Sequence, residues 1–201
     1  MFNLDSEEAI GFTEYINKFF RENADTHQAL ESSGGTGVEI FTSGRAMFYA
    51  HFLYTAPEMR GMEDDFGILP FPKKDEKQEN YITGLRDTFV GFCVPADNKD
   101  PEFVGTIMEA LCVSGTKNVI PAYYDVVLKG KTARDVESAE MLDIIKESMT
   151  VDFAYAYGLE LGNMANIFYL AYNAEVEFAS HWASQKESAE AKLAALLKNF
   201  E

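Results

Sequence analysis

The predicted fold depends on residues 38–49, which read Val38-Glu39-Ile40-Phe41-Thr42-Ser43-Gly44-Arg45-Ala46-Met47-Phe48-Tyr49. The first half of this stretch predicts a short helical turn that ends at Gly44, because glycine readily adopts the left-handed conformation that closes a helix. The aromatic and apolar residues that follow predict a strand over Arg45 to Tyr49. The stretch therefore indicates a chain that mixes helices with strands.

Two further strands are predicted next to prolines. Ile68 to Leu69 predicts a short strand that stops at Pro70, since proline has no N–H to donate to a paired strand. Thr88 to Val94 predicts a third strand, which ends at Pro95. These strands place a small central sheet in the middle third of the chain, so the expected class is helix-rich α/β.

Helical periodicity occupies the two ends of the chain. A first helix is predicted after the N-cap Ser6, and its apolar face is expected to be buried: Phe12, Tyr15, Ile16, Phe19 and Phe20. Residues 31–37 are rich in glycine and serine, which predicts a loop. From Pro101 onward the chain is expected to be mainly helical, beginning with a helix capped by Asp100.

Three more helices are predicted over residues 134–145, 164–171 and 178–200. In the last of them, apolar residues recur from Phe178 through Trp182 to Phe200, with charges between them. An amphipathic helix docked on the core fits this pattern, and so does a helix that pairs with a partner chain as a coiled coil. Trp182 is expected on the buried face.

The charge of the chain bears on its partners. Lys and Arg total 17 against 33 Asp and Glu, which gives a formal net charge of -16. Proteins bind nucleic acid largely by neutralising phosphates with basic side chains, and an acidic surface repels them. Nucleic acid is therefore not an expected partner.

The sequence offers few candidates for cofactor binding or for catalysis. Cys93 and Cys112 form no CxxC pair and lie in apolar runs, which predicts two buried thiols and neither a metal site nor another cofactor. The histidines are isolated from one another and from any nucleophile motif: His27, His51 and His181.

Two pairs of neighbouring acids are candidates for general acid and base work, Asp64 with Asp65 and Glu137 with Glu140. In so acidic a chain, a solvated acidic face explains both pairs better than catalysis does. No enzyme is expected. The first eight residues, from Met1 to Glu8, lack the basic and apolar regions of an export signal, and no later stretch is long and apolar enough to span a bilayer.

Aromatic residues crowd two short segments. One contains Phe48, Tyr49, Phe52 and Tyr54, and the other contains Tyr155 and Tyr157. Sugar rings present C–H faces to flat aromatic side chains while their hydroxyls bond to polar groups, so these residues are candidate sugar platforms. Burial in the core is the alternative explanation for each of them.

Several of these segments resemble one known family in their order along the chain. Residues 41–48 resemble the F-x-x-G-[KR]-A-[ML]-F element of the family 1 extracellular solute-binding proteins, and residues 62–73 resemble their G-x-x-P-x-P-K turn. Residues 78–81 and the strand that ends at Pro95 resemble the family's return through the hinge, and residues 121–124, 134–145 and 152–158 look like helical elements of its Gram-positive branch. The resemblance covers residues 36–158.

The resemblance implies a partial type 2 periplasmic-binding-protein fold, whose two lobes close around a sugar and deliver it to the membrane permease of an ABC importer. It assigns residues 1–84 to the C-terminal lobe, 85–130 to the hinge strand and the other lobe, and 131–201 to C-terminal helices. A full family member is roughly twice as long and begins with a signal peptide. The chain is thus expected to be the C-terminal portion of an extracellular, membrane-anchored lipoprotein, to bind carbohydrate weakly by itself and to self-associate.

The family pattern also suggests which residues contact the ligand, an oligosaccharide: Phe52, Tyr54, Asp87, Tyr155 and Tyr157. Asp87 follows Arg86, and a surface ion pair explains these two residues as well as a binding role does. Three functions therefore stand against one another: sugar capture for import, a helical structural or interaction protein without a small ligand, and a glycan-acting enzyme that uses scattered acids.

Overall fold

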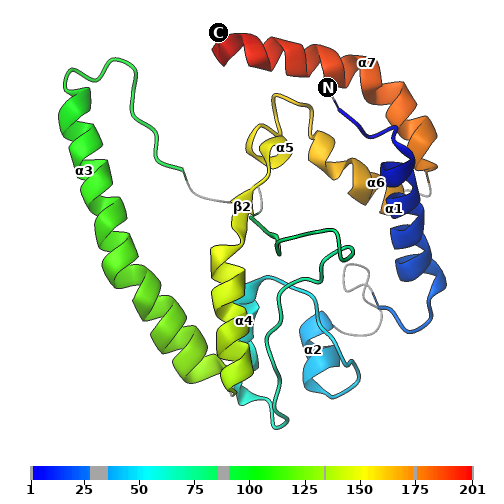
Figure 1. Cartoon of the computed structure of the whole chain (residues 1–201), viewed down its shortest axis with the longest axis vertical. Helices are drawn as coiled ribbons and strands as arrows, with labels where there is room; N and C mark the ends of the chain where they lie inside the picture. The colour runs from blue at the N-terminus through cyan, green and yellow to red at the C-terminus, as the bar shows by residue number, and fades with distance from the viewer. Residues whose placement is uncertain (1, 28–35, 86–90, 134, 174–175, 201) are drawn as a thin grey trace. The chain divides into compact units, whose positions relative to one another are not determined.

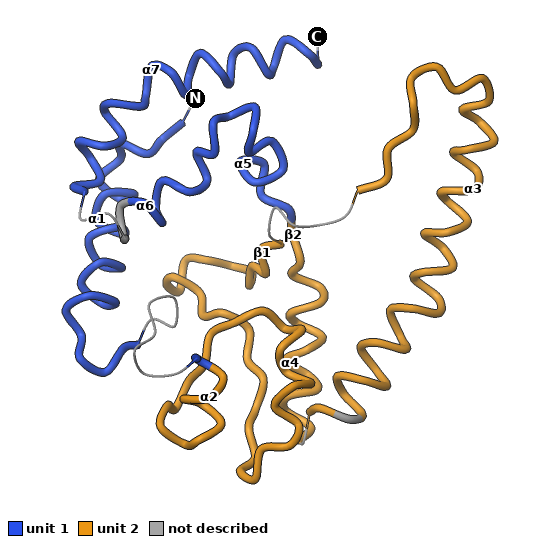
Figure 2. Tube along the Cα trace, turned by 180° about the vertical axis from the view of Figure 1, so that it is seen from behind, with its two compact units in different colours: residues 1–37, 151–201 blue, residues 38–150 orange. Residues whose placement is uncertain are grey.

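The structure is a computed structural model, and it describes residues 2–27, 36–85, 91–133, 135–173 and 176–200. The described chain is mostly helical and carries one small parallel sheet, in which β1 (Thr83–Leu85) pairs with β2 (Met149–Val151) (Figure 1). This composition is compatible with the expected helix-rich α/β class. The chain divides into two compact units (Figure 2): unit 1 comprises Met1–Gly37 and Val151–Glu201, and unit 2 comprises Val38–Thr150.

Unit 1 joins the two ends of the chain in one helical cluster. Its first helix begins where the sequence predicts, because the Ser6 side chain accepts a hydrogen bond from the backbone N–H of Ala9 at 3.2 Å. The last helix is capped by Glu177 in the same manner. The elements are α1 (Glu7–Asn17), η1 (Lys18–Glu22), α5 (Phe153–Ala156), η6 (Met164–Asn166), α6 (Ile167–Asn173), α7 (Phe178–Leu197) and η7 (Lys198–Phe200).

Trp182 lies at the centre of the core of unit 1 and is only 1% exposed, as its helical position predicts. The Phe2 ring meets it edge-on, with the ring centroids 5.8 Å apart. The buried residues around it come from α6 and α7, and partly buried ones come from the N-terminal segment, α1 and η6: Ile167, Phe178, Ala189, Phe2, Leu4, Ile10 and Met164. The apolar face of α7 is therefore docked on the core of its own chain.

The face that α1 buries is not the predicted one. Thr13 is buried and Ile10 packs against the core, whereas the aromatic side chains expected to be inside are exposed: Phe12, Tyr15, Phe19 and Phe20. Periodicity defines a stripe on a helix, but the neighbouring helices α6 and α7 decide which stripe they cover. The exposed rings instead contact one another, since Tyr15 stacks on Phe19 and Phe19 meets Phe20 edge-on.

Unit 2 contains one continuous helical run over residues 101–132. As predicted, Asp100 caps its start by accepting a hydrogen bond from the N–H of Phe103 at 3.0 Å. Pro121 lies inside the run and has no N–H, and wider π-helical turns surround it. The elements are α2 (Gly37–Thr42), η3 (Leu53–Gly61), β1, α3 (Pro101–Ser114), η4 (Gly115–Val119), η5 (Ala122–Thr132), α4 (Val136–Glu147) and β2.

The core of unit 2 forms where η5 and α4 meet the 3-10 helix η3. Leu128 of η5 and Leu142 of α4 are fully buried there. Around them pack residues from both of these helices, from η3 and from the 66–68 segment: Ala56, Met59, Phe66, Ile68, Tyr124 and Ile145. A salt bridge from Lys129 to Asp143 ties η5 to α4 at the edge of this core.

The predicted strands over Arg45 to Tyr49 and over Ile68 to Leu69 are wrong. Both segments are irregular in the structure. A strand exists only where a second backbone segment pairs with it, and the N–H of Ile68 bonds instead to the side chain of Ser138. Of the third predicted strand, residues 91–94 are also irregular, and residues 88–90 lie outside the described part of the chain.

The two thiols are not buried as predicted. Cys93 lies in the irregular 91–94 segment and Cys112 lies on α3, a helix that has no buried residue, so both are exposed and free. Across the described ranges, no helix has the length and apolar character that crossing a membrane requires.

Candidate functional site

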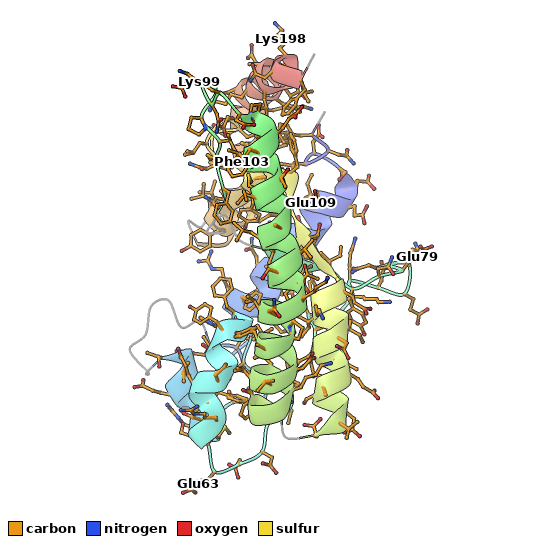
Figure 3. All side chains as sticks on the ribbon, turned by 90° about the vertical axis from the view of Figure 1, so that its left-hand side faces the viewer. Glu63, Glu79, Lys99, Phe103, Glu109 and Lys198 are labelled. Atoms are coloured by element: carbon orange, nitrogen blue, oxygen red, sulfur yellow. The ribbon has the colours of Figure 1, made fainter. Side chains whose placement is uncertain are left out.

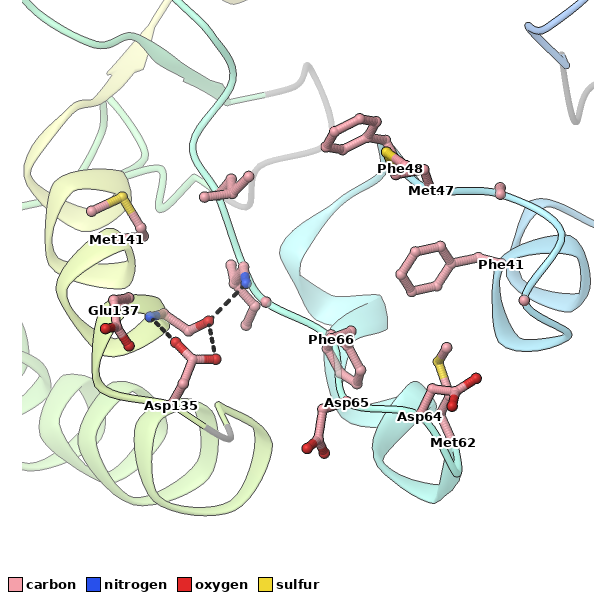
Figure 4. Close-up of a pocket in the computed structure, with 16 residues that line it drawn as sticks. Phe41, Met47, Phe48, Met62, Asp64, Asp65, Phe66, Asp135, Glu137 and Met141 are labelled. Atoms are coloured by element: carbon pink, nitrogen blue, oxygen red, sulfur yellow. Dashed lines mark hydrogen bonds between the residues drawn. The ribbon is translucent and has the colours of Figure 1, made fainter.

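Unit 2 contains a groove of about 450 Å³, which three segments of the chain line together (Figure 4). The first segment follows α2, the second precedes Pro70, and the third opens α4. The volume lies within the range of about 300 to 1,000 Å³ that is typical of small-molecule sites. Residues far apart in the sequence thus meet at one concave surface.

Gly44 turns the first segment into the groove. It ends α2 with φ +71°, donates its N–H to the carbonyl oxygen of Phe41 at 3.0 Å, and is followed by a bond from the Arg45 N–H to the Ile40 carbonyl at 3.1 Å. This pair of bonds is a Schellman motif, which needs a left-handed residue at the position of Gly44. The chain then reverses, and residues 46–48 line the groove.

Ser138 joins the other two segments. Its hydroxyl donates to a carboxylate oxygen of Asp135 at 2.9 Å and accepts from the backbone N–H of Ile68, also at 2.9 Å (Figure 4). Asp135 is also the N-cap of α4, because it accepts the N–H of Ser138. The same two side chains therefore start the helix and attach the 66–69 segment to it.

The groove combines an apolar wall with carboxylates. Aromatic and aliphatic side chains and methionines form the wall: Phe41, Met47, Phe48, Met62, Phe66, Ile68, Leu69 and Met141. Its acids are Asp64, Asp65, Asp135 and Glu137. Ionised carboxylates accept hydrogen bonds only, so this lining suits a ligand that carries several donors and an apolar face.

An aromatic strip leads from the groove to the surface of unit 2. We define it by its six rings in order of contact: Phe66, Phe41, Tyr49, His51, Phe52 and Tyr54. Phe41 meets Phe66 in the groove with ring centroids 6.3 Å apart and stacks on Tyr49 at 5.9 Å. Tyr49 stacks on His51 at 5.3 Å, and both Phe52 and Tyr54 meet the His51 ring edge-on.

Two stacked aromatic rings form the outer end of the strip. The rings of Phe52 and Tyr54 stack with centroids 5.7 Å apart and 14° between their planes, and these side chains are 39% and 60% exposed. Half-way along the strip, burial raises the pKa of Tyr49 above its ordinary value of 10.0, and nearby Tyr54 and Glu58 raise it further. The Tyr49 hydroxyl therefore keeps its proton at neutral pH.

The structure brings together two of the five predicted ligand residues, Phe52 and Tyr54. Tyr155 and Tyr157 are half-buried in unit 1, where the Tyr157 ring contacts Phe153 at 4.9 Å and Phe200 at 5.9 Å. Asp87 lies outside the described residues, as does Arg86.

Sequence reasoning missed most of the groove. In the sequence, Phe41 and Phe66 stand only as parts of motifs and His51 stands as an isolated histidine, although in the structure His51 carries the contact between Tyr49 and the outer pair. The spacing of His51 between Tyr49 and Phe52 is the one signal in the sequence that indicates this role. Of the paired acids, Asp64, Asp65 and Glu137 line the groove and are exposed, and Glu140 is exposed on α4.

Within the described ranges, no group of histidine, cysteine and acidic side chains is arranged to hold a metal ion. No protein-family model matches the sequence, and no curated protein matches it.

Proposed function

We propose that unit 2 binds a carbohydrate in its groove and along the aromatic strip, without chemically changing it. The observation that carries the proposal is the stacked, exposed pair of Phe52 and Tyr54 at the end of a strip that begins inside the groove. A contiguous row of aromatic rings that continues a groove is a common feature of ligand sites, unlike single exposed rings.

The chemistry of the lining supports this ligand class. The C–H face of a sugar ring packs on an aromatic plane, and the two nearly parallel rings of the outer pair offer such a plane. Sugar hydroxyls are donors, and acidic side chains line the groove at Asp64, Asp65 and Glu137, beside Asp135, whose two oxygens already accept from Ser138. An oligosaccharide matches both parts, because it repeats apolar faces and hydroxyls along its length.

The role in transport is a further part of the proposal, and it rests on the resemblance of the sequence to family 1 extracellular solute-binding proteins. The two segments that carry most of this resemblance, residues 41–48 and 62–73, also supply the first two walls of the groove. On this basis the chain is part of a type 2 periplasmic-binding fold, acts outside the cell as a lipoprotein, and passes its sugar to a membrane permease. The assignment of residues 1–84, 85–130 and 131–201 to lobes belongs to the same proposal.

A helical interaction protein without a small ligand is the second candidate. The observation that favours it is α3, which has no buried residue and carries exposed apolar side chains such as Phe103 and Leu111. The final helix, which gave this candidate its first support, favours it less, because Phe178 and Trp182 are buried in unit 1.

Calorimetry tests the proposal. The chain is titrated with malto-, xylo- and manno-oligosaccharides, and the products are checked for released monosaccharide. Phe52→Ala and Tyr54→Ala are expected to weaken binding by about 1 to 3 kcal/mol each, as loss of a well-packed aromatic contact does. Phe92→Ala is the matched control, since Phe92 is 78% exposed and lies outside the groove and the strip.

Equal affinity in the parent and in both strip variants would remove the site from unit 2. Binding that depends on Tyr157 and not on Phe52 would move it to unit 1, and release of monosaccharide would make the chain an enzyme. No binding of any sugar, together with a defined oligomer, would favour the interaction protein.

A further inference from the structure

The helix α3 presents a self-complementary stripe of large apolar and small residues. Along its exposed side lie Phe103, Ile107, Ala110 and Ser114, at successive spacings of four, three and four residues. This is the spacing of the seam positions in a coiled coil, which brings all four side chains to one face of the helix. Figure 3 views the chain from the α3 side, with Phe103 and Glu109 labelled on this helix.

The stripe is exposed along its whole length. All four residues are exposed, and Leu111 beside them is exposed as well, whereas the half-buried residues of α3, Val104 and Met108, lie further round the helix. In Figure 2 this part of the helical run extends away from α4, while η5 at its other end is held in the core by Leu128. The fold of unit 2 thus anchors one end of the run and leaves the α3 stripe uncovered.

The order of large and small residues along the stripe indicates which partner helix fits it. Large side chains, Phe103 and Ile107, stand in the first half of the stripe, and small ones, Ala110 and Ser114, stand in the second half. An antiparallel copy of the helix places Phe103 opposite Ser114 and Ile107 opposite Ala110, so that each layer pairs a large residue with a small one. A parallel copy stacks large on large and leaves gaps where small meets small.

The charges at the ends of the stripe agree with the same register. Asp100 precedes Phe103 by three residues, and Lys117 follows Ser114 by three. The antiparallel copy that matches the sizes therefore brings Asp100 of one chain beside Lys117 of the other at both ends of the stripe. Opposite charges at these positions favour the pairing and fix its direction.

We propose that two copies of this chain associate through α3, packed antiparallel along the stripe from Asp100 to Lys117. The occupant of the exposed stripe is thus a second copy of the same helix. The proposal is independent of sugar binding, since it uses no residue of the groove or of the aromatic strip.

Disulfide trapping in the full-length chain tests the register. With Cys93 and Cys112 changed to serine, one preparation carries Phe103→Cys and another carries Ser114→Cys. Each chain then carries a single cysteine, so every disulfide that forms joins two chains. We expect a cross-linked dimer only when the two preparations are mixed.

The trapped species separates the alternatives. Cross-linking of either preparation with itself would indicate a parallel pair and overturn the proposal. No cross-link in any sample would overturn it as well.

A second test measures self-association by sedimentation, in the parent and in variants that carry no introduced cysteine. Ile107→Asp is expected to raise the dissociation constant of the dimer by at least about tenfold, because it places a charge in the centre of the seam. Val113→Asp is the matched control, since Val113 is 43% exposed against 45% for Ile107 but lies away from the stripe. Circular dichroism shows whether each variant keeps its helices.

A parent chain that stays monomeric at all concentrations would overturn the proposal. Equal weakening of association by both aspartate variants would overturn it too, because the contact would then not follow the stripe.

Discussion

The hydroxyl of Ser138 accepts the backbone N–H of Ile68 at 2.9 Å, although the two residues are 70 positions apart in the chain. Ser138 is 2% exposed, so water does not replace this bond when it is lost. The Ser138 side chain, near the start of α4, thus provides the hydrogen-bond acceptor that a neighbouring strand would provide for the Ile68 N–H in a sheet.

Ser138→Ala is therefore expected to destabilise unit 2 by about 1 to 3 kcal/mol, because it leaves the buried N–H of Ile68 without an acceptor. Urea unfolding followed by circular dichroism measures the change. Ser184→Ala serves as the control, since the exposed Ser184 hydroxyl on α7 donates to the carbonyl of His181 and accepts from the side-chain amide of Gln185, two neighbours in the same helix. If the two variants lose the same stability, the link to Ile68 contributes nothing.

Trp182 is expected to stabilise unit 1 through the packing of its rings and not through a hydrogen bond from its indole Nε1. Trp182→Ala removes the largest buried side chain of unit 1 and is expected to cost about 3 to 5 kcal/mol of stability while leaving sugar affinity unchanged. Its Nε1 is buried and has no hydrogen-bond partner within the described residues, so Trp182→Phe is expected to cost clearly less than Trp182→Ala. Thermal melting of the three proteins gives the order, and a loss of sugar binding on either change would mark Trp182 as a ligand residue.

Two glycines are expected to respond to alanine in opposite directions. Gly162 has φ +69°, and a Cβ there would meet the side chain of Lys192, so Gly162→Ala is expected to destabilise unit 1 by about 1 to 2 kcal/mol. Gly105 lies inside α3 with open space around it, and Gly105→Ala is expected to stabilise the helix by about 0.5 to 1 kcal/mol. The midpoints of denaturant unfolding measure both changes in stability. A loss of stability in both variants would contradict the prediction for Gly105.

The ion pair between Asp5 and Lys186 is expected to give unit 1 a pH dependence. The hydrogen bond from Lys186 lowers the pKa of Asp5 below its ordinary value of 3.8. A carboxyl with a lowered folded-state pKa adds stability above its ordinary pKa and loses it as the pH falls through the lowered value. Lys186→Met is therefore expected to melt slightly below the parent at neutral pH and together with it at acid pH, once Asp5 is protonated.

Lys198→Met provides the control for this experiment, because Lys198 is an exposed lysine that follows α7 directly. A gap between parent and Lys186→Met that persists unchanged at the acid end would show that the lysine acts through packing of its alkyl chain and not through Asp5.

Local chemistry made the helices predictable from the sequence. Ser6, Asp100 and Asp135 each stand just before an apolar repeat, and each caps a helix through its own side chain. Gly44 likewise ends α2 where the sequence indicates, because only the residue itself and its immediate neighbours decide a left-handed turn. These features depend on contacts within four or five residues, which a single sequence displays directly.

The strands and the exposure of residues depended on distant partners. The segment around Ile68 has the composition of a strand, yet its N–H bonds to Ser138. The aromatic residues of α1 and η1 and Cys112 of α3 have the composition of a core, yet they are exposed. Burial is a property of two surfaces together, and one helix pattern does not specify which surface it meets.

The sequence by itself thus determined where α1, α3 and α4 begin, where α2 ends, and the acidic charge of the protein. Only the tertiary structure decided that Phe41, Asp64 and Glu137 line one groove, because they come from three segments that are brought together by the core around Leu128 and Leu142. Caps and turns are set by neighbours in the chain, whereas a concave site is set by the packing of segments that the chain keeps far apart.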